Sequence, residues 1–277
     1  MFSASELRVA AVQMVSSDRL ANNLVAIEEQ LFEAVSSGAK MVVLPENFAL
    51  MPKHPEQLLS LAERLGEGVV QDFLSKLSAK HQCWIVAGSL PIKSYEENKA
   101  YATCLVYNDM GEQLAHYHKI HLFDADIADS HGEYRESATF VAGSETVVVD
   151  TPFGTMGLSI CYDLRFPELY RQLLDKGADF IVAPSAFTKL TGRAHWALLC
   201  RTRAVENTCY LIAANQGGIH TSGRTTYGHS MIIDPLGTVL SELDTGVGFA
   251  TATLKRAVLN KVRTNLPAIQ HRRLLNK

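Results

Sequence analysis

Residues 157–171 read Gly-Leu-Ser-Ile-Cys-Tyr-Asp-Leu-Arg-Phe-Pro-Glu-Leu-Tyr-Arg and carry the strongest structural signal in the chain. An apolar run leads into Cys161, a polar corner follows, and Pro167 stands where an amphipathic helix would begin. The pattern predicts a buried strand that ends at Cys161. A thiol at the end of a strand lies beside backbone N–H groups that can stabilise an oxyanion. Cys161 is therefore a candidate nucleophile, although most single cysteines are ordinary buried side chains.

The composition and the charge of the chain limit the classes of protein to which it can belong. The chain has 277 residues, of which 47% are hydrophobic, and a formal net charge of −3, which favours one large core. No stretch approaches the roughly eighteen apolar residues of a membrane span, and the N-terminus lacks a signal-peptide pattern. The five cysteines are widely spaced without a C-x-x-C pair, which disfavours disulfides and a zinc ribbon. We expect one cytoplasmic domain over residues 1–277, with no nucleic-acid or membrane partner.

Helical and extended patterns alternate along the chain. Apolar spacing predicts helices over 24–34, 70–79 and 195–206, besides the helix that begins at Pro167. Apolar runs bounded by turn residues predict strands over 7–15, 41–44, 83–90, 101–107, 113–119, 146–150, 155–161, 180–183, 210–214, 231–234 and 238–240. Residues 124–144 are expected to form a long polar loop. Hairpins require antiparallel neighbours, so we predict an α/β fold with mixed sheets between helical layers.

Two more ionisable residues follow predicted strands. Glu46 comes directly after strand 41–44, where an unpaired buried carboxylate would cost several kcal/mol, although an exposed loop position is the alternative. Lys119 ends strand 113–119, and its long stem can reach inward. Strand ends build the sites of α/β proteins, so we expect both residues to meet Cys161. A base, a cation and a thiol suit cleavage of an amide or nitrile, with the Tyr162 N–H assisting at the oxyanion.

Three segments, residues 44–48, 117–123 and 160–169, resemble in their order and spacing the signature blocks of the nitrilase superfamily of carbon–nitrogen hydrolases. The resemblance covers nearly the whole chain. It implies an α-β-β-α sandwich, homodimers or larger homo-oligomers that associate through helices, and a reaction without a cofactor. It further implies that Glu46 is the general base, Lys119 the oxyanion cation and Cys161 the nucleophile that forms a thioester. Glu136 matches an additional active-site glutamate that orients the lysine.

Other short runs, at 185–187, 191–196, 203–206, 227–230 and 270–273, are most similar to the Nit branch of that superfamily. The branch contains deaminated glutathione amidases and ω-amidases. This resemblance implies hydrolysis of a small amide that bears a carboxylate. Deaminated glutathione is the first expected substrate, and 2-oxoglutaramate, 2-oxosuccinamate or another small aliphatic amide is the alternative.

The expected substrates end in a 2-oxo acid, whose carboxylate suits a bidentate guanidinium. We therefore expect Arg165 to bind this carboxylate, with Tyr162, Phe187 and Thr188 around the substrate. A structural ion pair is the alternative role for Arg165. His118 precedes Lys119 where the family commonly carries a basic residue, which changes the charge near the lysine.

Alternatives remain for the chemistry. A Cys–His hydrolase would pair Cys161 with His121 or His195, and a scaffold protein could have kept the fold without activity. His116 and His118 share one face of a strand, but no set of three or four ligands surrounds them, so we expect no metal. The basic tail from Lys261 to Lys277 is expected to be a solvated end or a subunit contact.

Overall fold

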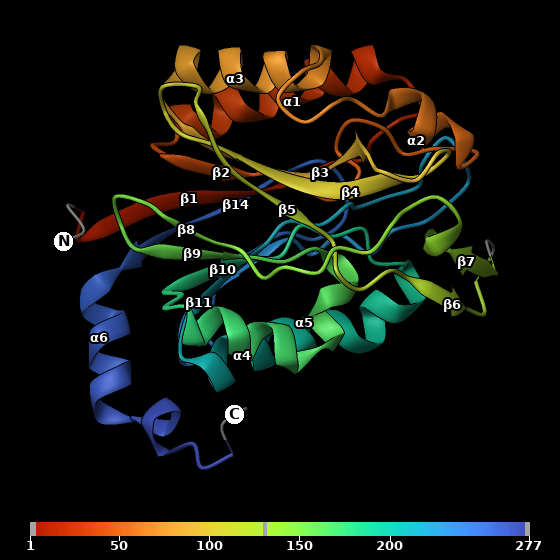
Figure 1. Ribbon diagram of the computed structural model, residues 1–277. Helices are drawn as coiled ribbons and strands as arrows, with labels where there is room; N and C mark the ends of the chain where they lie inside the picture. The colour runs from red at the N-terminus through yellow and green to blue at the C-terminus, as the bar shows by residue number, and fades with distance from the viewer. Residues whose placement is uncertain (1–3, 130–131, 275–277) are drawn as a thin grey trace.

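The computed structural model describes residues 4–129 and 132–274, and two six-stranded sheets form its centre (Figure 1). The first sheet has the order β14-β1-β2-β3-β4-β5, with the strands β1 (Glu6–Gln13), β2 (Met41–Val43), β3 (Trp84–Lys93), β4 (Ala100–Tyr107), β5 (Gln113–His118) and β14 (Gly248–Lys255). The second has the order β13-β12-β11-β10-β9-β8, with the strands β8 (Val148–Asp150), β9 (Thr155–Leu158), β10 (Phe180–Val182), β11 (Tyr210–Ala213), β12 (Met231–Ile233) and β13 (Val239–Glu242). Parallel and antiparallel pairs occur in both sheets, as predicted.

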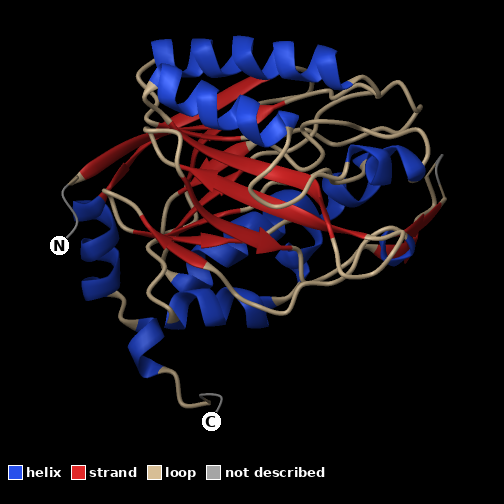
Figure 2. Cartoon of the chain, turned by 45° about the horizontal axis from the view of Figure 1, so that its top comes forward, coloured by secondary structure: helices blue, strands red, loops and turns tan. Residues whose placement is uncertain are grey.

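Helices cover the outer faces of the two sheets (Figures 1 and 2). The α-helices are α1 (Leu20–Ser36), α2 (Glu56–Leu61), α3 (Val69–His81), α4 (Pro167–Asp175), α5 (Lys189–Asn207) and α6 (Arg256–Asn265). Helices α1 and α3 lie over the first sheet, and α4 and α5 lie over the second (Figure 1). This arrangement is an α-β-β-α sandwich, which confirms the predicted fold class.

Side-chain alternation in the first sheet explains the layering. Val9 and Ala11 of β1 belong to the core shared with the second sheet, whereas Ala10 and Val12 pack with the residues of α1 and α3. Successive side chains of a strand point to opposite faces, so β1 is buried on both faces. A continuous apolar run is the sequence signature of such a strand.

Three differences from the predictions lie near the residues expected to form the site. Strand β9 ends at Leu158, and Cys161 begins a 3₁₀ turn (Cys161–Arg165) instead of ending the strand. Helix α5 begins at Lys189, well before residue 195, because Thr188 caps it and accepts a hydrogen bond from the Thr191 N–H. The described part of segment 124–144 is not one irregular loop, since β6 (Asp124–Asp126) pairs with β7 (Glu133–Arg135) and a 3₁₀ turn (Glu136–Ala138) follows.

Two elements near the C-terminus were not predicted. Strand β14 has small and polar residues at alternate positions, and it pairs with β1 along its whole length, from Glu6 with Lys255 to Gln13 with Gly248. Its partner is distant in the sequence, so local patterns give little sign of it. Helix α6 follows it and extends away from the four layers (Figure 1).

Part of the basic tail is held within the chain. Arg263 of α6 donates to Asp179 at 2.7 Å, and Arg256 lies 3.3 Å from the same carboxylate. Arg272 pairs with Asp175. Within the predicted tail, Arg263 and Arg272 are therefore paired within the chain and not simply solvated, and Lys277 lies outside the described residues.

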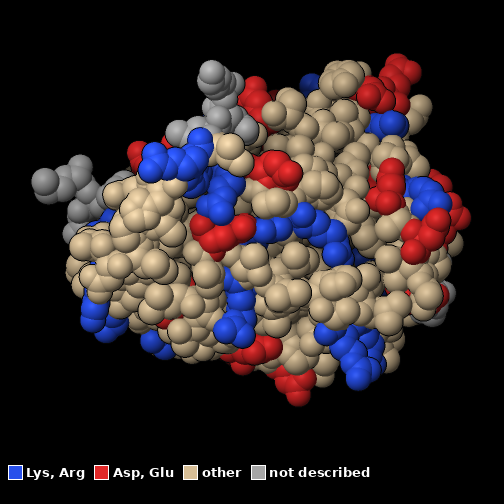
Figure 3. Space-filling view, turned by 90° about the horizontal axis from the view of Figure 1, so that it is seen from below, with Lys and Arg blue, Asp and Glu red and all other residues tan. Residues whose placement is uncertain are grey.

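The surface is mixed in charge. On the face shown in Figure 3, positive and negative side chains lie interspersed across a mainly neutral surface, in keeping with the formal net charge of −3. None of the helices in the described ranges combines the length and apolar character that crossing a bilayer would require.

Asp179 is expected to anchor helix α6. Replacing Asp179 by Asn removes a carboxylate that is only 6% exposed and that faces two guanidinium groups. We expect the free energy of unfolding to fall by about 2 kcal/mol, because a buried pair that loses one partner leaves the other charge uncompensated. Urea denaturation measures this change. The control is Asp175→Asn, which breaks the exposed pair with Arg272 and should cost about 0.5 kcal/mol or less. Equal effects of the two substitutions would contradict the assignment.

Candidate active site

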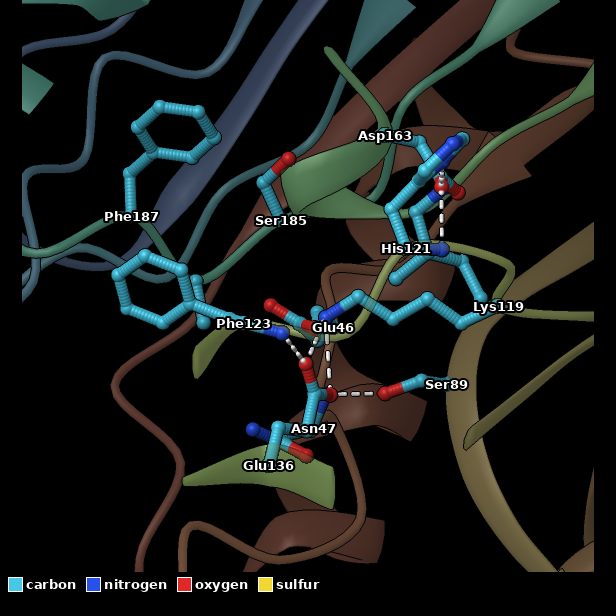
Figure 4. Close-up of polar contacts among 12 residues, drawn as sticks. Glu46, Asn47, Ser89, Lys119, His121, Phe123, Glu136, Asp163, Ser185 and Phe187 are labelled. Atoms are coloured by element: carbon cyan, nitrogen blue, oxygen red, sulfur yellow. Dashed lines mark hydrogen bonds and ion pairs between the residues drawn. The ribbon is translucent and has the colours of Figure 1, made fainter. Parts of the chain in front are cut away.

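The segments that follow β2, β5 and β7 meet at Lys119. Its Nζ lies 2.8 Å from Glu46 Oε1 and 2.8 and 2.9 Å from the two carboxylate oxygens of Glu136. Figure 4 shows the extended lysine side chain reaching Glu46. Glu46, Lys119, Glu136 and Cys161 line one cavity of about 360 Å³. The structure thus brings together the residues expected to form the site, and Glu46 is buried, so the exposed-loop alternative is wrong.

The loop that carries Glu46 is shaped by its neighbours. A side chain at Gly88 would place its Cβ 2.1 Å from the Pro45 carbonyl oxygen, so only glycine allows this close approach. The register between β3 and β4 shifts next to Gly88, and Ser89 Oγ accepts a hydrogen bond from the Asn47 N–H at 2.9 Å (Figure 4). Gln216 donates to the Glu46 carbonyl oxygen at 3.0 Å. These contacts from both sheets position the carboxylate.

The turn that carries Cys161 has a strained backbone. Cys161 has φ +49, a left-handed conformation that is uncommon outside glycine. Its N–H donates to the Pro184 carbonyl oxygen at 2.8 Å and is therefore occupied. No acceptor among the described residues pairs with the Tyr162 N–H. Tyr162, the next residue, therefore supplies the backbone donor that the turn leaves available.

Asp163 connects this turn to the segment that carries Lys119. Its Oδ2 accepts from the Ile160 N–H at 2.8 Å and from the Tyr117 hydroxyl at 2.7 Å. Its Oδ1 accepts from the His121 N–H at 3.1 Å and lies 2.6 Å from His121 Nδ1. Asp163 was not among the site residues predicted from the sequence. An acidic residue two positions after a predicted strand end is a recognisable capping signal, and it could have been used here.

The pKa values follow from burial and from the charges within the site. Burial disfavours the Lys119 ammonium, but Glu136 and Glu46 more than offset this and hold its pKa well above the usual value. Burial, followed by the Glu46 charge, raises the pKa of the Cys161 thiol, and Lys119 only partly opposes this. Burial also raises the pKa of Glu136. In the resting site Lys119 is charged and Cys161 is a neutral thiol beside a carboxylate.

The residues expected around the substrate all line the same cavity: Tyr162, Arg165, Phe187 and Thr188. The Arg165 guanidinium lies 5.7 Å from the centre of the Tyr162 ring and 5.5 Å from that of Phe187. It makes no ion pair with a carboxylate of the described residues, so the structural ion-pair alternative is not supported. The Thr188 hydroxyl also has the structural task of capping α5.

The histidines considered for a Cys–His hydrolase or a metal site make their contacts away from Cys161. His121 pairs with Asp163 and stacks on Phe166, and His195 Nδ1 lies 3.2 Å from an Arg165 nitrogen. Neither histidine lines the cavity that contains Cys161. His118 stacks on the Tyr101 ring, and burial lowers its pKa to about 4, so it adds no charge near Lys119 at neutral pH. The described residues hold no cluster of three or more metal-ligating side chains.

One cavity residue gave no signal in the sequence. Arg224 lies in the irregular segment between β11 and β12, without a motif or a periodic pattern around it. The structure nevertheless places its guanidinium in the wall of the cavity, 5.4 Å from the centre of the Tyr134 ring.

The sequence and the fold are similar to those of known proteins. The family model described as carbon-nitrogen hydrolase matches residues 8–264. A deaminated glutathione amidase of Synechocystis sp. is 44% identical over 266 residues, which make up 95% of this chain and 97% of that protein. The crystal structure of the C. elegans NitFhit protein has a TM-score of 0.90 at 35% identity and covers 98% of this chain, which spans 66% of that protein.

A second solved structure agrees over the full length. Saccharomyces cerevisiae Nit3, a member of branch 10 of the nitrilase superfamily, has a TM-score of 0.88 at 32% identity and covers 99% of each chain. The family match, the full-length relatives and the shared fold lead to one conclusion. The chain belongs to the carbon-nitrogen hydrolase family, and it is an amidase.

Proposed function

We propose that this amidase hydrolyses deaminated glutathione through a thioester on Cys161, with Glu46 as general base and Lys119 as the cation that stabilises the oxyanion. The observation that carries the proposal is the buried Lys119 ammonium, held between Glu46 and Glu136 in the cavity that Cys161 lines.

We also propose that the chain is one cytoplasmic domain. It would act as a homodimer through α5, whose Leu190, Leu198 and Val205 are exposed apolar residues.

The proposed reaction begins with a proton transfer. Glu46 takes the proton from the Cys161 thiol, and the thiolate sulfur forms a bond to the amide carbonyl carbon. Negative charge moves onto the carbonyl oxygen, where Lys119 and the Tyr162 N–H stabilise it. The C–N bond then breaks, the proton held by Glu46 passes to the departing nitrogen, and a thioester remains.

The second half of the reaction restores the enzyme. Glu46 takes a proton from water, and the resulting hydroxide attacks the thioester carbonyl carbon. The C–S bond breaks, the sulfur recovers the proton, and the carboxylic acid leaves. Glu136 has no proton to move in this scheme. Its role is to keep Lys119 charged and in place, as the two short contacts to Nζ indicate.

The choice of substrate rests on chemistry and on relatives. Arg165 lines the cavity without a carboxylate partner in the described part of the chain, so a substrate with a 2-oxo acid end would supply one. The similar protein from Synechocystis is named for deaminated glutathione. An ω-amidase is the second candidate, because 2-oxoglutaramate has the same acyl group as deaminated glutathione and 2-oxosuccinamate has one that is a methylene shorter.

Ammonia or amine release tests the proposal directly. We expect the wild type to act on deaminated glutathione faster than on 2-oxoglutaramate, a simple aliphatic amide or a nitrile, and Cys161→Ala to abolish turnover. Mass spectrometry should detect the acyl-thioester adduct on the wild type alone. A preference for 2-oxoglutaramate would make the enzyme an ω-amidase. The absence of any adduct or turnover with all of these compounds would contradict the proposed mechanism.

Glu46→Gln should separate the effect of Glu46 on the pKa of Cys161 from its role as the general base. Because Glu46 raises the pKa of Cys161, its neutral isostere should lower that pKa and shift the rise in the ultraviolet absorbance of the thiolate to lower pH in a pH titration. Turnover should nevertheless fall about 10²- to 10⁴-fold, since the base is lost. Cys161→Ala supplies the blank for the absorbance of the other thiols. Turnover that persists in Glu46→Gln would favour a Cys–His hydrolase instead.

Glu136→Gln tests the positioning of the lysine. Removing this charge takes away one of the two anions that hold the pKa of Lys119 high. We expect kcat to fall about 10- to 100-fold, because one charged hydrogen-bond partner of the oxyanion cation is lost, while KM changes little. The matched control is Glu133→Gln, since Glu133 also lines the cavity but pairs with Arg135 and is 67% exposed. Similar losses in both variants would contradict this role.

A further inference from the structure

An aromatic row crosses the wall of the cavity and has a guanidinium group at each end. The ring centres of Tyr162 and Phe123 are 5.0 Å apart, and those of Phe123 and Tyr134 are 5.1 Å apart. Arg165 lies over the Tyr162 ring and Arg224 lies over the Tyr134 ring. All five residues line the cavity. Three aromatic rings in sequence therefore connect the two guanidinium groups along this wall.

The cations of the cavity differ in whether a carboxylate neutralises them. Besides Lys119, the lining includes four lysine and arginine side chains: Lys53, Arg135, Arg165 and Arg224. Lys53 lies 2.6 Å from Asp18, and Arg135 lies 2.7 Å from Asp126 and 2.9 Å from Glu133. The two arginines at the ends of the aromatic row make no ion pair with any carboxylate in the described ranges. Among the lysine and arginine side chains that line the cavity, only Arg165 and Arg224 thus lack a carboxylate partner within the described residues.

Arg224 is fixed in position, yet part of its guanidinium is uncommitted. Its Nη2 donates to the Ala186 carbonyl oxygen at 2.7 Å, which holds the group against the wall. Its Nη1 has only the Met51 sulfur at 3.8 Å, and its Nε has no hydrogen-bond partner within the described residues. A guanidinium taken partly out of water without an anion is costly, and a carboxylate is the planar anion that matches its donors.

We propose that Arg224 is a specificity residue that binds a carboxylate on the leaving group of the substrate, while Arg165 binds the carboxylate of the acyl group. The inference rests on the proposed function and extends it to a substrate class: linear amides with a carboxylate on each side of the scissile bond. Deaminated glutathione belongs to this class, because its 2-oxo acid and its glycine each end in a carboxylate. The leaving group of 2-oxoglutaramate is ammonia, which carries none.

The test compares deaminated glutathione with the same compound capped as its glycine carboxamide. Release of 2-oxoglutarate is measured, since both compounds yield it. The wild type should prefer the acid over the capped compound by about 10- to 100-fold in kcat/KM, as expected for one charge-assisted hydrogen-bonded pair. Arg224→Met should bring this ratio close to one, mainly through KM for the acid, and Arg224→Lys should keep part of the preference. The ratio is independent of the fraction of folded enzyme.

Lys53→Met is the matched control, because Lys53 lines the same cavity but is already paired with Asp18. Its ratio should stay within about twofold of the wild type. An equal loss on both compounds in Arg224→Met would show a structural role for the arginine and overturn the inference. A wild type that hydrolyses both compounds equally would also overturn it, while leaving the proposed function intact. Turnover confined to 2-oxoglutaramate would instead overturn the proposed function, and the inference with it.

Discussion

The buried ammonium of Lys119 is the constraint on which the rest of the site depends. A charge that is 1% exposed is stable only with close partners, and here the carboxylates of Glu46 and Glu136 both lie within 3 Å. Each partner comes from a different part of the chain. The first follows β2, and the second follows β7 in the segment between the two halves of the sandwich. The charge therefore requires these segments to converge.

Sequence patterns predicted those parts of the site that have a local cause. Glu46, Lys119 and Cys161 each follow an apolar strand closely, and a strand end is visible in the sequence itself. The other features depend on distant partners. Strand β14 is stabilised by pairing with β1 at the other end of the chain, and Arg224 reaches the cavity from an irregular segment whose path only the folded structure defines. No local periodicity encodes either one.

The strained backbone at Cys161 fixes the sulfur atom from which the proton leaves. The left-handed φ of +49 persists because Asp163 holds the Ile160 N–H and the Pro184 carbonyl oxygen holds the Cys161 N–H. The same Asp163 also binds the backbone after Lys119. One buried carboxylate thus sets the position of the thiol relative to the ammonium, although it lies outside the cavity that they line. A turn held this firmly keeps the sulfur in place while the proton moves.

The charges within the site also explain why the residues proposed to bind the substrate differ from those proposed to react with it. The Lys119 ammonium is already engaged by the carboxyl groups of Glu46 and Glu136, and Cys161 is a neutral thiol. The reacting centre therefore offers no unpaired cation to an anionic substrate, so the carboxylates of the substrate need cations elsewhere in the cavity. Arg165 and Arg224 meet that need, because they stand at the two ends of the aromatic row and no carboxylate of the described residues pairs with either guanidinium.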